Sequence, residues 1–231
     1  MTRTTMARQA GMLYLPTVIL APFTLIYIPG ALFVRGDAAA TVNNIAAHET
    51  LFRVGIVTDL FSVILWIFII LALYRLLRGV DQACAVVMAV LGGVMVTIVN
   101  FLITLNNLAA LVLVRGADFL SAFDKPQRDA LAMLFLRIHD QGVLAAEIFW
   151  GLWLFPLAIL VYRSRFLPRL LGVWLVLNGL AYLAMSFTGL LLPQYAEMVG
   201  KATFPALFGE LALMLWLLIK GAPEQTLVPN P

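Results

Sequence analysis

The sequence predicts an all-α, polytopic transmembrane helical bundle with about six spans. Apolar residues make up 63% of the 231 residues and charged residues only 12%, whereas an ordinary soluble domain has roughly 45–50% and 25%. The apolar residues also gather into six stretches, each close to the roughly 20 residues that a helix needs to cross the hydrocarbon layer. Because six spans leave only short loops, we expect a single integral membrane domain over residues 1–231, surrounded by the lipid bilayer.

Charged residues, prolines or glycines bound each apolar stretch. The predicted spans are about 11–34, 54–74, 84–114, 141–162, 168–192 and 203–220. The first follows a basic start, as a signal peptide would, but it is longer than the roughly 7–15 apolar residues of a signal peptide, so we expect an uncleaved span. Pro16, Pro22 and Pro29 interrupt it. Membrane helices tolerate proline when neighbouring groups satisfy the freed carbonyls, so this helix is expected to be kinked.

The fourth helix is expected to begin before the bilayer. Residues 128–137 have helical spacing but carry Arg128, Asp129 and Arg137. Such a segment belongs in water or at the membrane interface.

Basic residues predict the orientation of the chain. An even number of spans puts both termini on one side, and short cytoplasmic loops carry an excess of Lys and Arg. With the termini inside, the inner segments hold eight basic residues, opposed only by Asp81 and Glu224, whereas the seven outer ones are mixed with six acidic residues. The inner eight are Arg3, Arg8, Arg75, Arg78, Arg163, Arg165, Arg169 and Lys220. We therefore expect cytoplasmic termini, and we interpret the formal charge of +3 as a topology signal rather than as a nucleic-acid-binding surface.

Three carboxyl groups within the spans are the strongest indication of a functional site. Asp59, Glu147 and Glu210 lie near the starts of the second, fourth and sixth spans. An ionisable group inside the membrane costs roughly 2.5–3.5 kcal/mol and usually faces a cavity or a partner. Because these three helices all enter from the outer side, we expect the carboxyls at similar depth in the outer half of the bilayer.

Uncharged polar groups accompany the carboxyls. Steps of three or four residues place Thr97, Asn100, Thr104 and Asn107 on one face of the third span, and Asn178, Tyr182 and Ser186 on one face of the fifth. On the fourth helix, Asp140 and Glu147 are seven residues apart and therefore share a face, with His139 beside Asp140. The predicted pocket residues are Asp59, Asn100, Asn107, His139, Asp140, Glu147, Asn178, Tyr182 and Glu210.

Structural interpretations remain open beside a pocket. Asn, Ser and Thr hold membrane helices together at roughly 0.6 kcal/mol each without any ligand. The carboxyls would then be buried beside Arg53, Arg137 or a tyrosine hydroxyl. A metal site of His48, His139 and their carboxylate neighbours is disfavoured, because no metal-binding spacing such as H-E-x-x-H is present. A Ser or Cys nucleophile is also disfavoured, since there is no G-x-S-x-G motif and Cys84 lies at the opposite end from both histidines.

The sequence thus predicts a multi-pass membrane protein that binds or acts on a small or lipid-like molecule in a polar pocket in the outer half of the bilayer. The alternatives are a small proton-coupled transporter and a non-catalytic membrane subunit of a larger complex. A homo-oligomer or a protein partner is compatible with each, and no pattern identifies a cofactor or decides whether the protein is an enzyme.

Three runs carry a family resemblance: LWLFPLAILVYRSRFLPRLLGVWLVLNGLAYL at 152–183, LALYRLLRGVDQACAVVMAVLGG at 71–93 and GELALMLWLLIKG at 209–221. They resemble a bacterial family of six-helix membrane proteins catalogued as domain of unknown function 4386, over about residues 8–221. The resemblance implies a six-helix fold and a bacterial inner-membrane location. It implies no activity and no catalytic residue.

Overall fold

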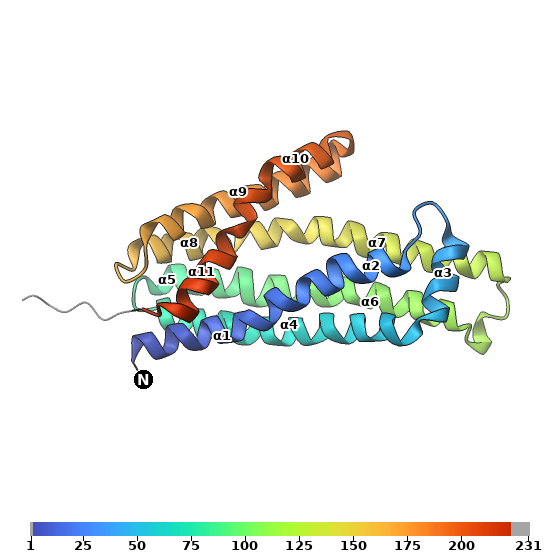
Figure 1. Ribbon diagram of the computed structural model, residues 1–231, viewed down its shortest axis with the longest axis horizontal. Helices are drawn as coiled ribbons and strands as arrows, with labels where there is room; N and C mark the ends of the chain where they lie inside the picture. The colour runs from blue at the N-terminus through green and yellow to red at the C-terminus, as the bar shows by residue number, and fades with distance from the viewer. Residues whose placement is uncertain (1, 223–231) are drawn as a thin grey trace, which may run out of the picture. The chain divides into compact units, whose positions relative to one another are not determined.

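The computed structural model describes residues 2–222, and every regular element within that range is helical. The α-helices are α1 (Arg3–Pro22), α2 (Ile28–Leu32), α3 (Ala38–Ala47), α4 (Glu49–Leu77), α5 (Gln82–Met88), α6 (Val96–Arg115), α7 (Lys125–Leu152), α8 (Leu154–Arg163), α9 (Arg169–Leu191), α10 (Ala196–Thr203) and α11 (Phe208–Ile219) (Figure 1). Segments η1 (Phe23–Tyr27) and η2 (Ala89–Met95) are π-helical, and η3 (Asp118–Leu120), η4 (Pro193–Tyr195) and η5 (Phe204–Leu207) are 3-10 helices.

Six helical stretches are long and apolar enough to cross a membrane, which confirms the predicted fold class and the predicted number of spans. They are Arg3–Leu32, Glu49–Leu77, Gln82–Arg115, Lys125–Arg163, Arg169–Leu191 and Pro193–Ile219. The first begins eight residues before the predicted boundary at 11. The fourth begins at Lys125, which confirms that its helix starts before the apolar stretch at 141. Helical hydrogen bonds continue into the polar flanks, whereas the apolar pattern marks only the part that contacts lipid.

The first span changes its hydrogen-bonding pattern where its prolines lie. α1 ends at Pro22, the π-helical η1 follows, and α2 contains Pro29. Proline lacks an N–H donor and cannot continue the regular ladder. A π-helical segment also joins α5 to α6 at the glycine pair Gly92 and Gly93.

The chain forms two compact units, which we call unit 1 and unit 2. Unit 1 comprises residues 2–16, 65–97 and 144–222 of the described chain. Unit 2 comprises residues 17–64 and 98–143.

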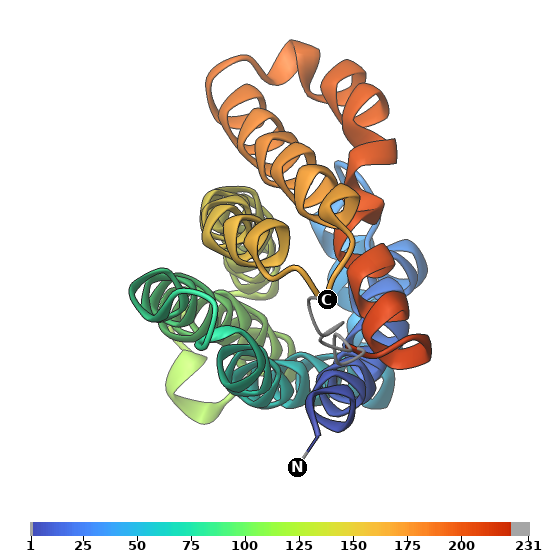
Figure 2. The same ribbon diagram turned by 90° about the vertical axis from the view of Figure 1, so that its left-hand side faces the viewer.

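Glycines bring helices of unit 1 into close contact. A Cβ atom on Gly151 would lie 2.7 Å from the carbonyl oxygen of Gly179, and one on Gly179 would lie 2.9 Å from that of Gly151. Between α8 and α9, a Cβ on Gly172 would lie 2.9 Å from the carbonyl oxygen of Ala158. Small residues allow membrane helices to approach in this way. After α9 the chain turns back through α10 into α11 (Figures 1 and 2).

In unit 2, α6 exposes apolar side chains and buries a polar one, as a helix in a bilayer does. Phe101, Leu105, Leu108 and Val112 recur at steps of four, three and four residues and are all exposed on the surface of the chain. Asn107, by contrast, is only 8% exposed. A membrane helix presents apolar side chains to lipid and keeps its polar groups inside the protein.

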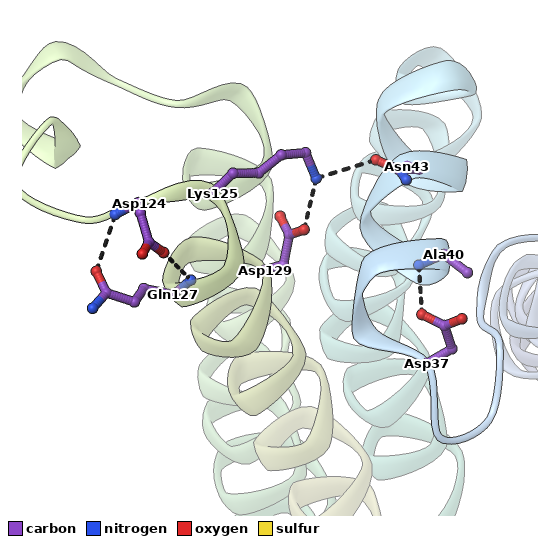
Figure 3. A network of polar contacts seen from close by, with 7 residues as sticks. All are labelled: Asp37, Ala40, Asn43, Asp124, Lys125, Gln127 and Asp129. Carbon is purple, nitrogen blue, oxygen red and sulfur yellow. Dashed lines mark hydrogen bonds and ion pairs between the residues drawn. The ribbon is translucent and has the colours of Figure 1, made fainter.

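Polar contacts fix the start of α7 and tie it to α3 (Figure 3). Asp124 and Gln127 form a capping box: the Asp124 carboxylate accepts from the Gln127 N–H at 2.8 Å, and the Gln127 side-chain oxygen accepts from the Asp124 N–H at 3.0 Å. The Lys125 ammonium donates to Asp129 at 2.6 Å and to the side-chain oxygen of Asn43 in α3 at 3.3 Å. These bonds explain why the fourth helix begins so far ahead of its apolar part.

Candidate functional site

A cluster of hydrogen bonds surrounds Glu210 in unit 1. The Tyr14 hydroxyl, from α1, donates to Glu210 Oε1 at 2.8 Å. The Tyr182 hydroxyl, from α9, donates to Glu210 Oε2 at 3.4 Å. Both oxygens of this membrane-embedded carboxyl are therefore paired with tyrosines, which is one of the structural interpretations that the sequence left open.

Asn178 fixes the start of α11 against α9. Its side-chain oxygen accepts a hydrogen bond from the backbone N–H of Glu210 at 3.1 Å. The first N–H groups of a helix have no partner within the helix, so a side chain from elsewhere must supply one. Gly209 permits this approach, because a Cβ there would lie 3.0 Å from the carbonyl oxygen of Trp174 and 3.1 Å from the Asn178 side-chain oxygen.

Aromatic rings continue from Tyr14 into the core of unit 1. The Tyr14 and Trp66 rings lie 5.5 Å apart, and Trp66 meets Trp153 edge to face at 5.3 Å. The Trp66 indole N–H donates to the Gly92 carbonyl oxygen at 2.8 Å. A side chain at Gly92 would collide with the Trp153 ring, because its Cβ would lie 2.9 Å from that ring.

A small, mainly apolar cavity lies beside Glu210. Tyr14, Ile69, Trp153 and Met214 are among the residues that line it together with Glu210. The cavity leaves about 10 Å³ for the centre of a water molecule. This is about the minimum volume that holds one water molecule. Any larger ligand must displace one of these side chains.

Five buried side-chain atoms of unit 1 have no hydrogen-bond partner among residues 2–222: Thr97 Oγ1, Glu147 Oε2, Asn178 Nδ2, Ser186 Oγ and Trp216 Nε1. Glu147 is 8% exposed and Ser186 fully buried. Native proteins pair nearly all such groups, so each unpaired one requires an explanation such as a bound water or ligand.

Two of these five atoms, Glu147 Oε2 and Ser186 Oγ, lie in one stretch of the helix pair α7–α9. The two helices touch at Gly151 with Gly179, and again at Gly189, where a Cβ would lie 2.7 Å from the side chain of Leu144. Glu147 lies between the two α7 contacts, and Tyr182 and Ser186 lie between the two α9 contacts. Tyr182 therefore connects this stretch, which we call the α7–α9 polar layer (Glu147, Tyr182 and Ser186), to Glu210.

Five of the nine predicted pocket residues belong to unit 2: Asp59, Asn100, Asn107, His139 and Asp140. The Asp59 carboxyl interacts with the Thr24 hydroxyl and with the His139 imidazole. His139 Nδ1 lies 3.6 Å from Asp140 Oδ1, but the Asp140 side chain is 50% exposed.

Polar side chains of α6 form some of their hydrogen bonds within the helix itself. The Thr104 hydroxyl donates to the Asn100 carbonyl oxygen at 2.9 Å, and the Asn106 amide donates to the carbonyls of Leu102 and Ile103. Asn107 Oδ1 is buried with no partner in the described part of the chain. No group of three or more His, Cys, Asp or Glu within residues 2–222 is placed to hold a metal ion.

The remaining four candidates, Glu147, Asn178, Tyr182 and Glu210, belong to unit 1. At 1.5 Å per residue, Glu210 lies roughly 14 Å along the helix from the end of α11 at Ile219. Tyr14 was not among the predicted residues, although a hydroxyl within the apolar run 11–34 is itself a signal of a polar partner.

Comparison with known proteins agrees with this architecture. The chain matches the family described as "Domain of unknown function (DUF4386)" over residues 9–221. The chain belongs to this family. The membership confirms the resemblance found in the sequence. This membership also fits the six membrane-spanning helices, because the match to DUF4386 extends from the first to the last of them.

A relative of this DUF4386 protein is an uncharacterized protein of Archaeoglobus fulgidus, 35% identical over 100 residues. The aligned part covers 42% of this chain and 54% of the relative, so the chain spans about half the length of the relative that it matches. No solved structure matches the chain.

Proposed function

We propose that this membrane protein binds a small polar or lipid-like molecule at the α7–α9 polar layer, beside Glu210. The observation that carries the proposal is the pair of buried, unpaired atoms Glu147 Oε2 and Ser186 Oγ. No water is available within a bilayer to satisfy such groups, so leaving them unpaired is costly. A ligand that hydrogen-bonds to them removes that cost.

The residue types define what such a ligand offers. A carboxylate oxygen accepts hydrogen bonds, and a serine hydroxyl both donates and accepts them. Glu147 and Glu210 form no ion pair with a basic residue in the described part of the chain. The site therefore favours a neutral or positively charged molecule with hydroxyl, amide or amine groups, and disfavours an anion.

The proposal also includes an orientation and a location. The two terminal segments and the short loops on the same side of the bundle carry eight of the basic residues, so we place both termini in the cytoplasm and the protein in the bacterial inner membrane. The ligand then reaches its site from within the bilayer, by displacement of side chains between the helices.

Native mass spectrometry of the detergent-purified protein tests the proposal, with identification of copurifying lipids and metabolites. Glu147→Gln keeps the size of the side chain and changes its hydrogen bonding, and Ser186→Ala removes only a hydroxyl. Glu197→Gln is the matched control, because the Glu197 side chain is 82% exposed and its ion pair is with the exposed Lys201.

A molecule that copurifies with the wild type and with Glu197→Gln, but is lost from Glu147→Gln and reduced in Ser186→Ala, supports the proposal and identifies the ligand class. An empty wild-type protein with the same thermal stability as Glu147→Gln contradicts it. The carboxyl would then be structural, and a non-catalytic subunit would be the better interpretation.

A further inference from the structure

The helix ends of unit 1 near the two termini form a strongly basic face. Four chain segments contribute to it: residues 2–8, 75–82, 163–169 and 220–222. Together they contain eight basic residues and a single acidic one, Asp81. We call these segments the basic face.

Three contacts hold the four segments together. The Arg3 guanidinium lies over the Phe166 ring, 4.7 Å from its centroid. The Thr4 hydroxyl donates to the carbonyl oxygen of Ala222 at 2.8 Å. Arg163 pairs with Asp81 at 3.2 Å. Positive charges from segments far apart in the sequence therefore gather within one unit.

In the turn between α8 and α9, an arginine has a backbone conformation that glycine adopts more readily. Arg165 has φ of 60° and is the one non-glycine residue with a positive φ in the described part of the chain. This left-handed conformation disfavours residues that carry a Cβ. Hydrogen bonds of Ser164 hold the turn: its hydroxyl donates to the Val161 oxygen at 2.8 Å and accepts from the Leu167 N–H at 3.2 Å. The chain carries Arg163, Arg165 and Arg169 in and beside this short turn.

Exposed apolar side chains lie next to residues of the basic face. Leu170 is 72% exposed beside Arg169, Val173 is 45% exposed one turn further, and Ile219 is 62% exposed beside Lys220. In a membrane protein such side chains contact acyl chains. A molecule that joins a phosphate to acyl chains fits both features, whereas free phosphate or a soluble anion fits only the first.

We propose that the basic face binds the headgroup phosphates of anionic phospholipids, such as phosphatidylglycerol, from the surrounding bilayer. Arginine suits this role because its planar guanidinium pairs with phosphate through two hydrogen bonds. Basic residues at a membrane surface are attracted to anionic lipid. This inference is independent of the proposed ligand at the α7–α9 polar layer, because the two sites share no residue.

The test compares lipid retention in native mass spectra of the delipidated protein, after addition of phosphatidylglycerol or phosphatidylcholine at equal concentrations. The variant combines Arg165→Gly, which relieves the unfavourable φ, with Arg169→Gln, which removes a charge at similar size. The control is Lys201→Gln, because Lys201 is an exposed basic residue of the same unit outside the basic face.

We expect the wild type and Lys201→Gln to retain several-fold more phosphatidylglycerol than phosphatidylcholine, and the double variant to retain both lipids equally. Equal retention of the two lipids by the wild type overturns the proposal, and so does an equal loss in Lys201→Gln. Displacement of phosphatidylglycerol by millimolar inorganic phosphate overturns the assignment to a lipid. If the double variant is unstable, Arg169→Gln alone must still lower the preference at least twofold.

Discussion

Replacing Gly179 by alanine introduces one methyl group at the contact between α7 and α9. The new Cβ would lie 2.9 Å from the Gly151 carbonyl oxygen and 3.3 Å from the Phe155 ring. An unstrained contact between a carbon and an oxygen atom is longer than 2.9 Å, and the opposing atom belongs to the backbone, so a change of side-chain rotamer cannot relieve the clash. The two helices must separate by several tenths of an ångström.

The expected loss of stability follows from two opposing effects. Overpacking of this kind costs about 1–3 kcal/mol, whereas alanine is better than glycine inside a helix by about 0.8–1 kcal/mol. Gly200→Ala in α10 shares the second effect but not the first, because nothing lies within 4 Å of its Cβ position. The difference between the two variants therefore isolates the packing cost. At about 2–4 °C per kcal/mol for a chain of this size, Gly179→Ala should melt roughly 2–12 °C below Gly200→Ala.

Thermal unfolding in detergent, monitored with a thiol-reactive fluorogenic dye, measures this difference. The chain has a single cysteine, Cys84, whose thiol is partly buried and donates to the Pro156 carbonyl oxygen. Unfolding exposes that thiol. Equal melting temperatures for the two variants would refute the close contact between Gly151 and Gly179.

Further substitutions test the hydrogen bonds near Glu210 with the same assay. Tyr14→Phe should destabilise the protein by about 1 kcal/mol, because it leaves Glu210 Oε1 without its 2.8 Å donor. Tyr182→Phe should have a smaller effect, because that contact is 3.4 Å; a larger effect for Tyr182→Phe would contradict the geometry. Trp66→Phe should cost about 0.5–1.5 kcal/mol through loss of the indole bond to the Gly92 carbonyl, and an unchanged melting temperature would show that this bond is absent.

The fold was readable from the sequence because a bilayer restricts what a chain can do. Every backbone group within the hydrocarbon layer must be paired, so a long apolar stretch is a helix. Hydropathy alone does not mark helix ends. The helical spacing of 128–137 predicted that the fourth helix begins before its apolar part, and the capping box of Asp124 and Gln127 places that start near Lys125. The polar residues after Arg3, by contrast, concealed the start of α1.

The site was only partly predictable. Spacing along one helix correctly indicates which residues share a face, and it grouped Asn178, Tyr182 and Ser186. Spacing does not show which helices are neighbours. Asp59 lies in unit 2 with His139, whereas Glu147 and Glu210 lie in unit 1. The partnership of Tyr14 with Glu210 joins residues 196 positions apart, which no local pattern can reveal.

The central claim is that the α7–α9 polar layer holds a bound molecule. An experimental structure of the protein, extracted in lipid nanodiscs without detergent and resolved well enough to show ordered waters, tests it most directly. We predict non-protein density within hydrogen-bonding distance of Glu147 Oε2 or Ser186 Oγ. If both atoms instead pair with protein groups and the space between α7 and α9 holds no such density, the claim is wrong.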